Sequence, residues 1–151
     1  MSTKLRRVAG CVVALVGCAV LASAGDRATP PEAQALLDKA VKAVQADEAK
    51  ALAAFNDPKG GYQDRDLYVF CTGPDGKTSA HRDAKMIGVE SATIKTPDGR
   101  AVGKEIAALG QKGGGTIEYQ WPNPLTSKVE TKVSYIKKAG NQVCGVGAYK
   151  P

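Results

Sequence analysis

The sequence is poor in the residues that catalytic and metal sites most often use. Its 151 residues include one His and four Cys, and no Cys-x-x-Cys-His segment is present. These absences exclude a His-rich metal site and covalent haem attachment. Cys71 and His81 are the one possible nucleophile–base pair, but no recognisable carboxylate or oxyanion-hole motif accompanies them. The sequence therefore disfavours an enzyme.

Patterns typical of nucleotide and nucleic-acid binding are also missing. Residues 73–78 end in Gly-Lys-Thr like a phosphate-binding loop, but the spacing is two residues short and the segment joins two predicted strands. No stripe of Lys and Arg with interleaved aromatics is present. The net charge of +6 falls to +3 without residues 1–24, which carry three basic residues and no acid. We predict no nucleic-acid partner and no cofactor.

The N-terminus has the pattern of a secretory signal. Basic residues at positions 4, 6 and 7 precede an apolar run over 8–21 and the small residues Ala22-Ser23-Ala24. This pattern predicts a signal peptide over residues 1–24, cleavage after Ala24 and a periplasmic protein. The run is shorter than the roughly 20 residues of a membrane span. A lipobox-like segment ending at Cys18 leaves lipidation open, although the apolar residues after Cys18 argue against it.

A short polar leader over 25–30 precedes a single domain over 31–151. Thr29, Pro30 and Glu32 have the spacing of a helix N-cap, a first helical Pro and a capping box. Residues 31–55 lack internal Gly and Pro and repeat apolar residues at helical spacing, which predicts one long amphipathic helix. Asn56, Asp57 and the glycines that follow end it.

The hydrophobic period changes to two from Asp66 onward. Five antiparallel strands are expected: residues 67–72, a second strand that ends at His81, and residues 116–121, 129–138 and 142–149. A short helix over 101–109 is inserted before the third strand. The predicted fold class is α+β, with a long N-terminal helix packed on a five-stranded antiparallel sheet.

The predicted hairpin over 119–135 concentrates unusual residues. It carries the single Trp of the chain, Trp121, together with Tyr119, Tyr135 and Lys132. One interpretation is an amphipathic hairpin whose aromatics fill a core and whose Lys snorkels to water. The other is a binding surface, because a cation among apolar side chains is costly unless an anion meets it.

An ordered series of short segments resembles the single Cache domain, the extracytoplasmic sensor module of bacterial chemoreceptors and histidine kinases. The series comprises LYVF at 67–70, Asp-Gly at 75–76, Ala-His at 80–81, Ile-Gly at 87–88, Pro-Asp-Gly at 97–99, the triple Gly at 113–115, EYQWPNP at 118–124, KVSY at 132–135 and CGVGAY at 144–149. The resemblance spans residues 31–149. It implies a PAS-like sheet order in which the first and last strands are neighbours.

The resemblance also implies a pocket for a small organic acid between the sheet and the segment that crosses it. The residues that match this pocket are Phe70, His81, Ile87, Tyr119, Trp121, Lys132 and Tyr135. Lys132 and Tyr135 are three residues apart, so both line one pocket only if a bulge or strong twist intervenes. The alternative role for Tyr135 is core packing.

Two cysteines, Cys71 and Cys144, remain once the signal is removed, and an even pair in an exported protein predicts one disulfide. The implied sheet order places them on adjacent strands.

Because the sequence ends two residues after Tyr149, we expect a free periplasmic ligand-binding module. It would act with a membrane sensor kinase, chemoreceptor or transporter in signal transduction or uptake. The alternative is a protein-interaction or accessory subunit with a vestigial pocket.

Overall fold

The computed structural model describes residues 27–151. Its helices are α1 (Pro30–Ala46), α2 (Glu48–Asn56) and α3 (Val102–Gln111), with 3-10 turns η1 (Ala84–Met86) and η2 (Ser91–Thr93). Its strands are β1 (Gln63–Asp64), β2 (Leu67–Thr72), β3 (Thr78–Ala80), β4 (Gly114–Pro122), β5 (Val129–Ala139) and β6 (Gln142–Tyr149). The predicted signal peptide and Cys18 lie outside these residues. Among the described helices, none has the length and apolarity to cross a membrane.

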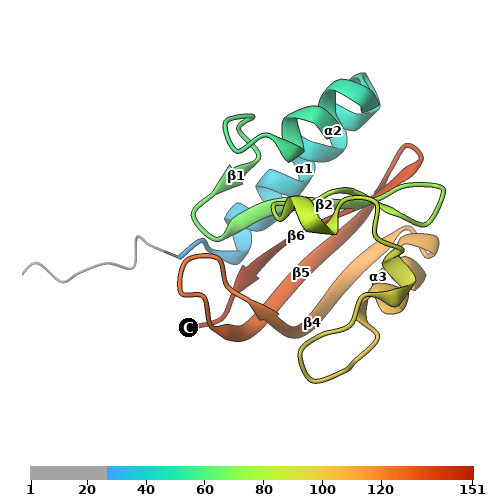
Figure 1. The fold of residues 1–151 in the computed structure, drawn as a ribbon. Helices are drawn as coiled ribbons and strands as arrows, with labels where there is room; N and C mark the ends of the chain where they lie inside the picture. Colours follow the sequence, from blue (N-terminus) through green and yellow to red (C-terminus); the bar gives the residue numbers. More distant parts are fainter. Residues whose placement is uncertain (1–26) are drawn as a thin grey trace, which may run out of the picture.

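The strands form one antiparallel sheet with the order β1-β2-β6-β5-β4, and β3 pairs with β2 beside this path. The α+β prediction is confirmed, with the two-residue β1 as an addition. Strand β6 lies between β2 and β5, so the predicted pairing of the first and last long strands is also confirmed. Figure 1 shows α1 and α2 on one face of the sheet and α3 on the other.

The two faces bury separate hydrophobic clusters. The cluster on the side of α1 and α2 includes Leu37, Phe55, Val69 and Val146. The cluster on the side of α3 includes Val102, Ile117 and Ile136. Period-two alternation along the strands explains this division, because successive side chains point to opposite faces. The second cluster is the smaller one and lies beside the candidate site.

The N-terminal helix begins as predicted but is interrupted. The side chain of Thr29 accepts a hydrogen bond from Glu32 N–H and the Glu32 side chain returns to Thr29, which completes the capping box. The prediction of one continuous helix is wrong at Asp47, which is extended (φ −162°) and accepts a hydrogen bond from Lys50 N–H. An Asp at this position caps a second helix instead of continuing the first.

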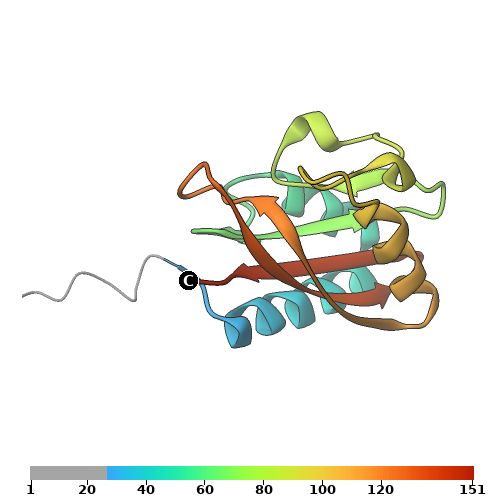
Figure 2. The ribbon, with the colours of Figure 1, turned by 90° about the horizontal axis from the view of Figure 1, so that it is seen from below.

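The predicted leader is bound to the domain at its C-terminal end. Arg27 forms a bidentate ion pair with Glu130 of β5, at 2.5 and 3.0 Å. Ala28 is buried, and its N–H donates to Asp66 Oδ1 at 2.8 Å. Figure 2 shows the C-terminus beside the start of α1, in agreement with a contact from Arg27 to the Lys150 carbonyl.

Candidate functional site

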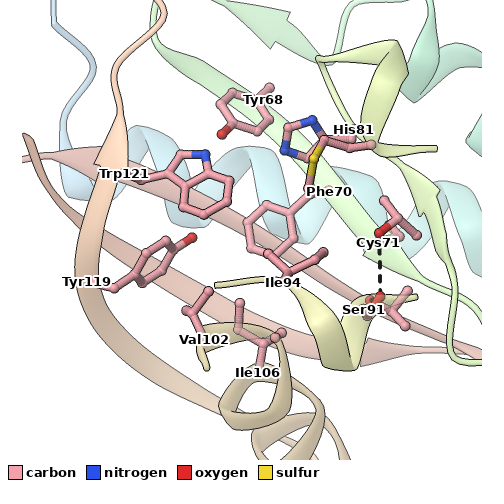
Figure 3. Close-up of a pocket in the computed structure, with 14 residues that line it drawn as sticks. Tyr68, Phe70, Cys71, His81, Ser91, Ile94, Val102, Ile106, Tyr119 and Trp121 are labelled. Carbon is pink, nitrogen blue, oxygen red and sulfur yellow. Dashed lines mark hydrogen bonds between the residues drawn. The ribbon is translucent and has the colours of Figure 1, made fainter. Parts of the chain in front are cut away.

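A cavity of about 50 Å³ lies between the sheet and the segment over residues 81–106. At about 10–15 Å³ for each water-sized group, it holds roughly four such groups. Figure 3 shows side chains from β2, β4, η2 and α3 pointing toward this space. The lining is predominantly apolar and aromatic: Tyr68, Phe70, Met86, Ile94, Val102, Ile106, Tyr119 and Trp121, with His81, Thr72, Thr78 and Ser91 as polar members.

Two glycines of β6 make room for side chains of this site. Gly145 and Gly147 alternate along the strand, and a Cβ would meet Phe70 at Gly145 and Lys132 and Ser134 at Gly147. A Cβ at Gly147 would lie 2.5 Å from Lys132 Cε, closer than real Cβ contacts. The sequence Cys-Gly-Val-Gly-Ala at 144–148 therefore places side chains on the face of α1 and α2 and leaves room on the other face for Phe70 and Lys132.

Tyr68, His81 and Trp121, whose side chains each carry a hydrogen-bond donor, line both this cavity and a larger hollow beside it. The amide N–H of Asp83 donates to His81 Nδ1 at 2.9 Å, so the neutral imidazole carries its proton on Nε2. Burial and the nearby Lys132 lower the pKa of His81 to about 4, which keeps the ring neutral. In Figure 3 the indole nitrogen of Trp121 lies on the side of its ring that faces Tyr68. The cavity thus combines apolar walls with a neutral donor set.

Neighbouring elements hold the donor residues in place. Asn56, at the end of α2, accepts a hydrogen bond from His81 N–H at 3.0 Å. The His81 ring packs edge-on against Tyr68, with 5.1 Å between centroids. Trp121 packs edge-on against Tyr119, whose hydroxyl is 3.0 Å from Ser134 Oγ.

Lys132 lies beneath this donor set and is completely buried, with an exposed fraction of 0%. Its Nζ is 3.9 Å from the ring centroid of Tyr68, 5.2 Å from Tyr149 and 5.5 Å from Phe70. Nζ makes no hydrogen bond to the described residues. Burial lowers the pKa of Lys132 to about 7, and the charge of Asp66 opposes this shift.

Asp66 supplies the negative charge that acts on the pKa of Lys132. Its exposed fraction is 0%, and Oδ1 is occupied by the N–H of Ala28. Within residues 27–151, Oδ2 has no hydrogen-bond partner and no ion pair joins Asp66 to Lys132. Both groups are therefore desolvated without full compensation.

A larger hollow of about 450 Å³ adjoins the small cavity. The two share Tyr68, His81, Met86 and Trp121, and the larger one continues to Arg82, Asn123 and Ser127. It connects the donor set with the surface.

The structure brings four of the seven predicted ligand-binding residues to the cavity: Phe70, His81, Tyr119 and Trp121. Lys132 lies behind the rings of Tyr68 and Phe70 and does not line the cavity. Ile87 is 39% exposed, and the preceding Met86 occupies the wall instead.

Tyr135 packs against the hydrophobic cluster under α1 and α2, on the face of the sheet opposite the cavity. The β5 pairing is continuous through Lys132 and Tyr135 on both of its neighbours, so the bulge that would unite them is absent from this strand. The alternative role for Tyr135, core packing, matches this placement.

Tyr68, Asp66 and the α3 side chains that line the cavity were not predicted from the sequence. The alternation in LYVF places Tyr68 on the same face as Phe70, so that signal was available. Val102 and Ile106 are four residues apart, which puts both on one face of α3. No pattern marks Asp66, an acid beside an apolar strand, as a buried residue.

The predicted disulfide joins Cys71 and Cys144, which are register partners on β2 and β6 with 4.1 Å between their Cα atoms. A bridged Cys71 has no thiol to act as a nucleophile with His81. No three His, Cys, Asp or Glu side chains in residues 27–151 are grouped closely enough to hold a metal ion.

Residues 22–149 match the family described as single Cache domain 2. The methyl-accepting chemotaxis protein McpP of Pseudomonas putida is 33% identical over 90 residues, which are 57% of this chain and 16% of McpP.

Solved sensor structures share the fold. The methyl-accepting chemotaxis protein of Vibrio parahaemolyticus superposes with a TM-score of 0.66 at 21% identity, covering 79% of this chain and 86% of that one. A Cache chemosensory domain studied for carboxylic acid recognition gives 0.59 at 25% identity, covering 80% and 88%. A periplasmic sensor domain of a chemotaxis protein gives 0.60 at 19% identity, covering 80% and 90%.

Proposed function

Because the chain belongs to the single Cache domain family, whose members are sensory ligand-binding modules, we propose that it binds a short monocarboxylate outside the cytoplasm. Acetate, propionate, lactate and pyruvate are the candidate ligands. The bound state would be passed to a membrane partner of the receptor, sensor-kinase or transporter class, in signalling or uptake. The similarity to a Cache domain that recognises carboxylic acids supports this ligand class.

The observation that carries the proposal is a small apolar cavity whose lining includes the donor side chains of Tyr68, His81 and Trp121. A carboxylate accepts hydrogen bonds and donates none, so it matches the Tyr68 hydroxyl, the Trp121 N–H and the His81 Nε2–H. The whole cavity, about 50 Å³, suits a short acid with few carbon atoms and is too small for a sugar.

Lys132 would contribute to carboxylate binding through the electrostatic field of its charge and not through direct contact. The Tyr68 ring centroid is 3.9 Å from Nζ. A carboxylate on the far side of that ring would lie about 7 Å away, where two unit charges interact by about 2 kcal/mol at an effective dielectric constant of 20. Lys132→Met should therefore weaken carboxylate binding by roughly 25-fold.

The test is a thermal-shift screen of small acids, amines, sugars and amino acids on the domain, followed by titration of the best acid. Lys132→Met should reduce the affinity, and Lys138→Met, on the exposed part of the same strand, should not. Stabilisation by amines or sugars alone would overturn the carboxylate assignment. The absence of any hit would favour the accessory-subunit alternative with a vestigial pocket.

A further inference from the structure

Lys132 and Asp66 carry the two buried side-chain atoms without a hydrogen-bond partner in residues 27–151. The carboxylic acid hypothesis uses Lys132 as a positive charge, but the ligand-free site does little to stabilise that charge. Three aromatic ring faces lie around Nζ. Such faces attract a cation, yet they replace only part of the hydration that full burial removes.

Apart from Asp66, the polar groups around Lys132 are paired with other groups or uncharged. On β4, the Tyr119 hydroxyl is paired with Ser134 Oγ; on β6, the Tyr149 hydroxyl donates to the Pro122 carbonyl. Two residues earlier on β5, Glu130 is paired with Arg27. The other titratable or charged groups are Asp66 and Tyr68 on β2, His81 after β3, and Arg82 next to His81.

These surroundings favour a neutral amine in the ligand-free protein. Burial lowers the pKa of Lys132 to about 7, so the amine is largely uncharged above that pH. A bound carboxylate behind the Tyr68 ring would add a second negative charge near Nζ and raise the pKa of Lys132 again.

On the basis of the proposed function, we infer that the site takes up a proton together with its anion, and that Lys132 is the group that accepts it. The free amine, one proton from solvent and one carboxylate anion give an ammonium and a bound carboxylate. The domain would then respond to acid anion and acidity jointly, and would report most strongly where a short acid accumulates at low pH.

The expected size of the pH effect on acid binding follows from the interaction between the bound anion and the Lys132 ammonium. If the bound anion raises the pKa of Lys132 by about 1.7 units, binding should be roughly 20-fold weaker at pH 8.5 than at pH 6. Other groups contribute little to this change. The pKa of His81 is about 4, and burial raises the pKa values of Tyr68, Tyr119 and Tyr149.

Calorimetric titration of propionate in HEPES and in Tris at pH 7.5 measures the proton count, because these buffers differ in ionisation enthalpy. We expect uptake of roughly 0.7 proton per ligand. Lys132→Met should abolish the uptake and the pH dependence, while Lys138→Met should keep both. Asp66→Asn removes the charge that favours the ammonium, so it should move the affinity profile to lower pH.

Titration of the ligand-free protein with ¹³Cε-labelled lysine separates this inference from the proposed function. One lysine signal should titrate near pH 7 and be missing in Lys132→Met. Binding that is independent of pH, or a Lys132 signal that titrates with the surface lysines, would overturn the proton linkage alone. A titration near pH 7 with no acid bound at any pH would refute the proposed function, and the linkage with it.

Discussion

Lys132→Met should stabilise the ligand-free protein, and the gain should shrink as the pH rises. Methionine keeps the length and apolar contacts of the side chain and removes an amine whose Nζ has no hydrogen-bond partner among the described residues. Replacement of a buried ionisable group by an apolar one of similar volume is often neutral or stabilising.

The magnitude follows from the pKa of Lys132, which burial lowers from 10.5 to about 7. Because the folded-state pKa lies below the unfolded value, the unfolded chain binds more protons between pH 7 and 10.5, and stability rises with pH in that window. The whole shift corresponds to about 5 kcal/mol, of which about 2.5 kcal/mol should be regained between pH 6 and pH 9.

Urea unfolding at pH 6, 7.5 and 9 measures the unfolding free energy of the wild type, Lys132→Met and Lys138→Met. The difference in unfolding free energy between wild type and Lys132→Met should change by 2 to 3 kcal/mol across the range. Titrations shared by both proteins cancel in the difference. Parallel curves for the two proteins would refute the account of Lys132 as a buried, poorly compensated amine.

Four other predictions concern the disulfide, the packing around Lys132, the indole N–H of Trp121 and the N-terminus of the exported protein. Cys144→Ser should lower the unfolding free energy by about 4 kcal/mol, the chain-entropy value for a sequence separation of 73, with ligand affinity retained in calorimetry. Gly147→Ala should crowd Ser134 and Lys132, cost about 1 to 3 kcal/mol of stability and reduce acid binding; unchanged affinity would argue against the role of Lys132 in binding. Trp121→Phe removes the indole N–H and should weaken propionate binding roughly tenfold, and an unaffected affinity would remove Trp121 from the donor set. Intact mass of the exported protein should place its N-terminus at Gly25, whereas a diacylglyceryl Cys18 species in membranes would contradict that cleavage.

Patterns that depend on local chemistry were predictable from the sequence. The capping box at Thr29, the period-two strands and the turn at residues 73–76 follow from rules that act within a few residues. The disulfide between Cys71 and Cys144 required one long-range inference, the pairing of the first and last long strands.

Features that depend on tertiary packing were not predictable in the same way. Asp47 interrupts a segment with good helical spacing because its side chain caps the next helix. The spacing of apolar residues does not reveal such a cap. Tyr135 and Lys132 both belong to an aromatic hairpin, but the regular register of β5 sends them to opposite faces. The burial of Phe70 and Lys132 over β6 is signalled only by the alternation of Gly145 and Gly147, which make room for them.

The central claim, an anion bound by neutral donors and a nearby lysine, is tested most directly by one calorimetric comparison at pH 6.5. Propionate and propionamide have nearly the same shape, and only propionate carries the charge. We predict that propionate binds at least tenfold more tightly than propionamide, and that the difference shrinks in Lys132→Met. Equal affinities in the wild-type protein, or tighter binding of the amide, would contradict the account.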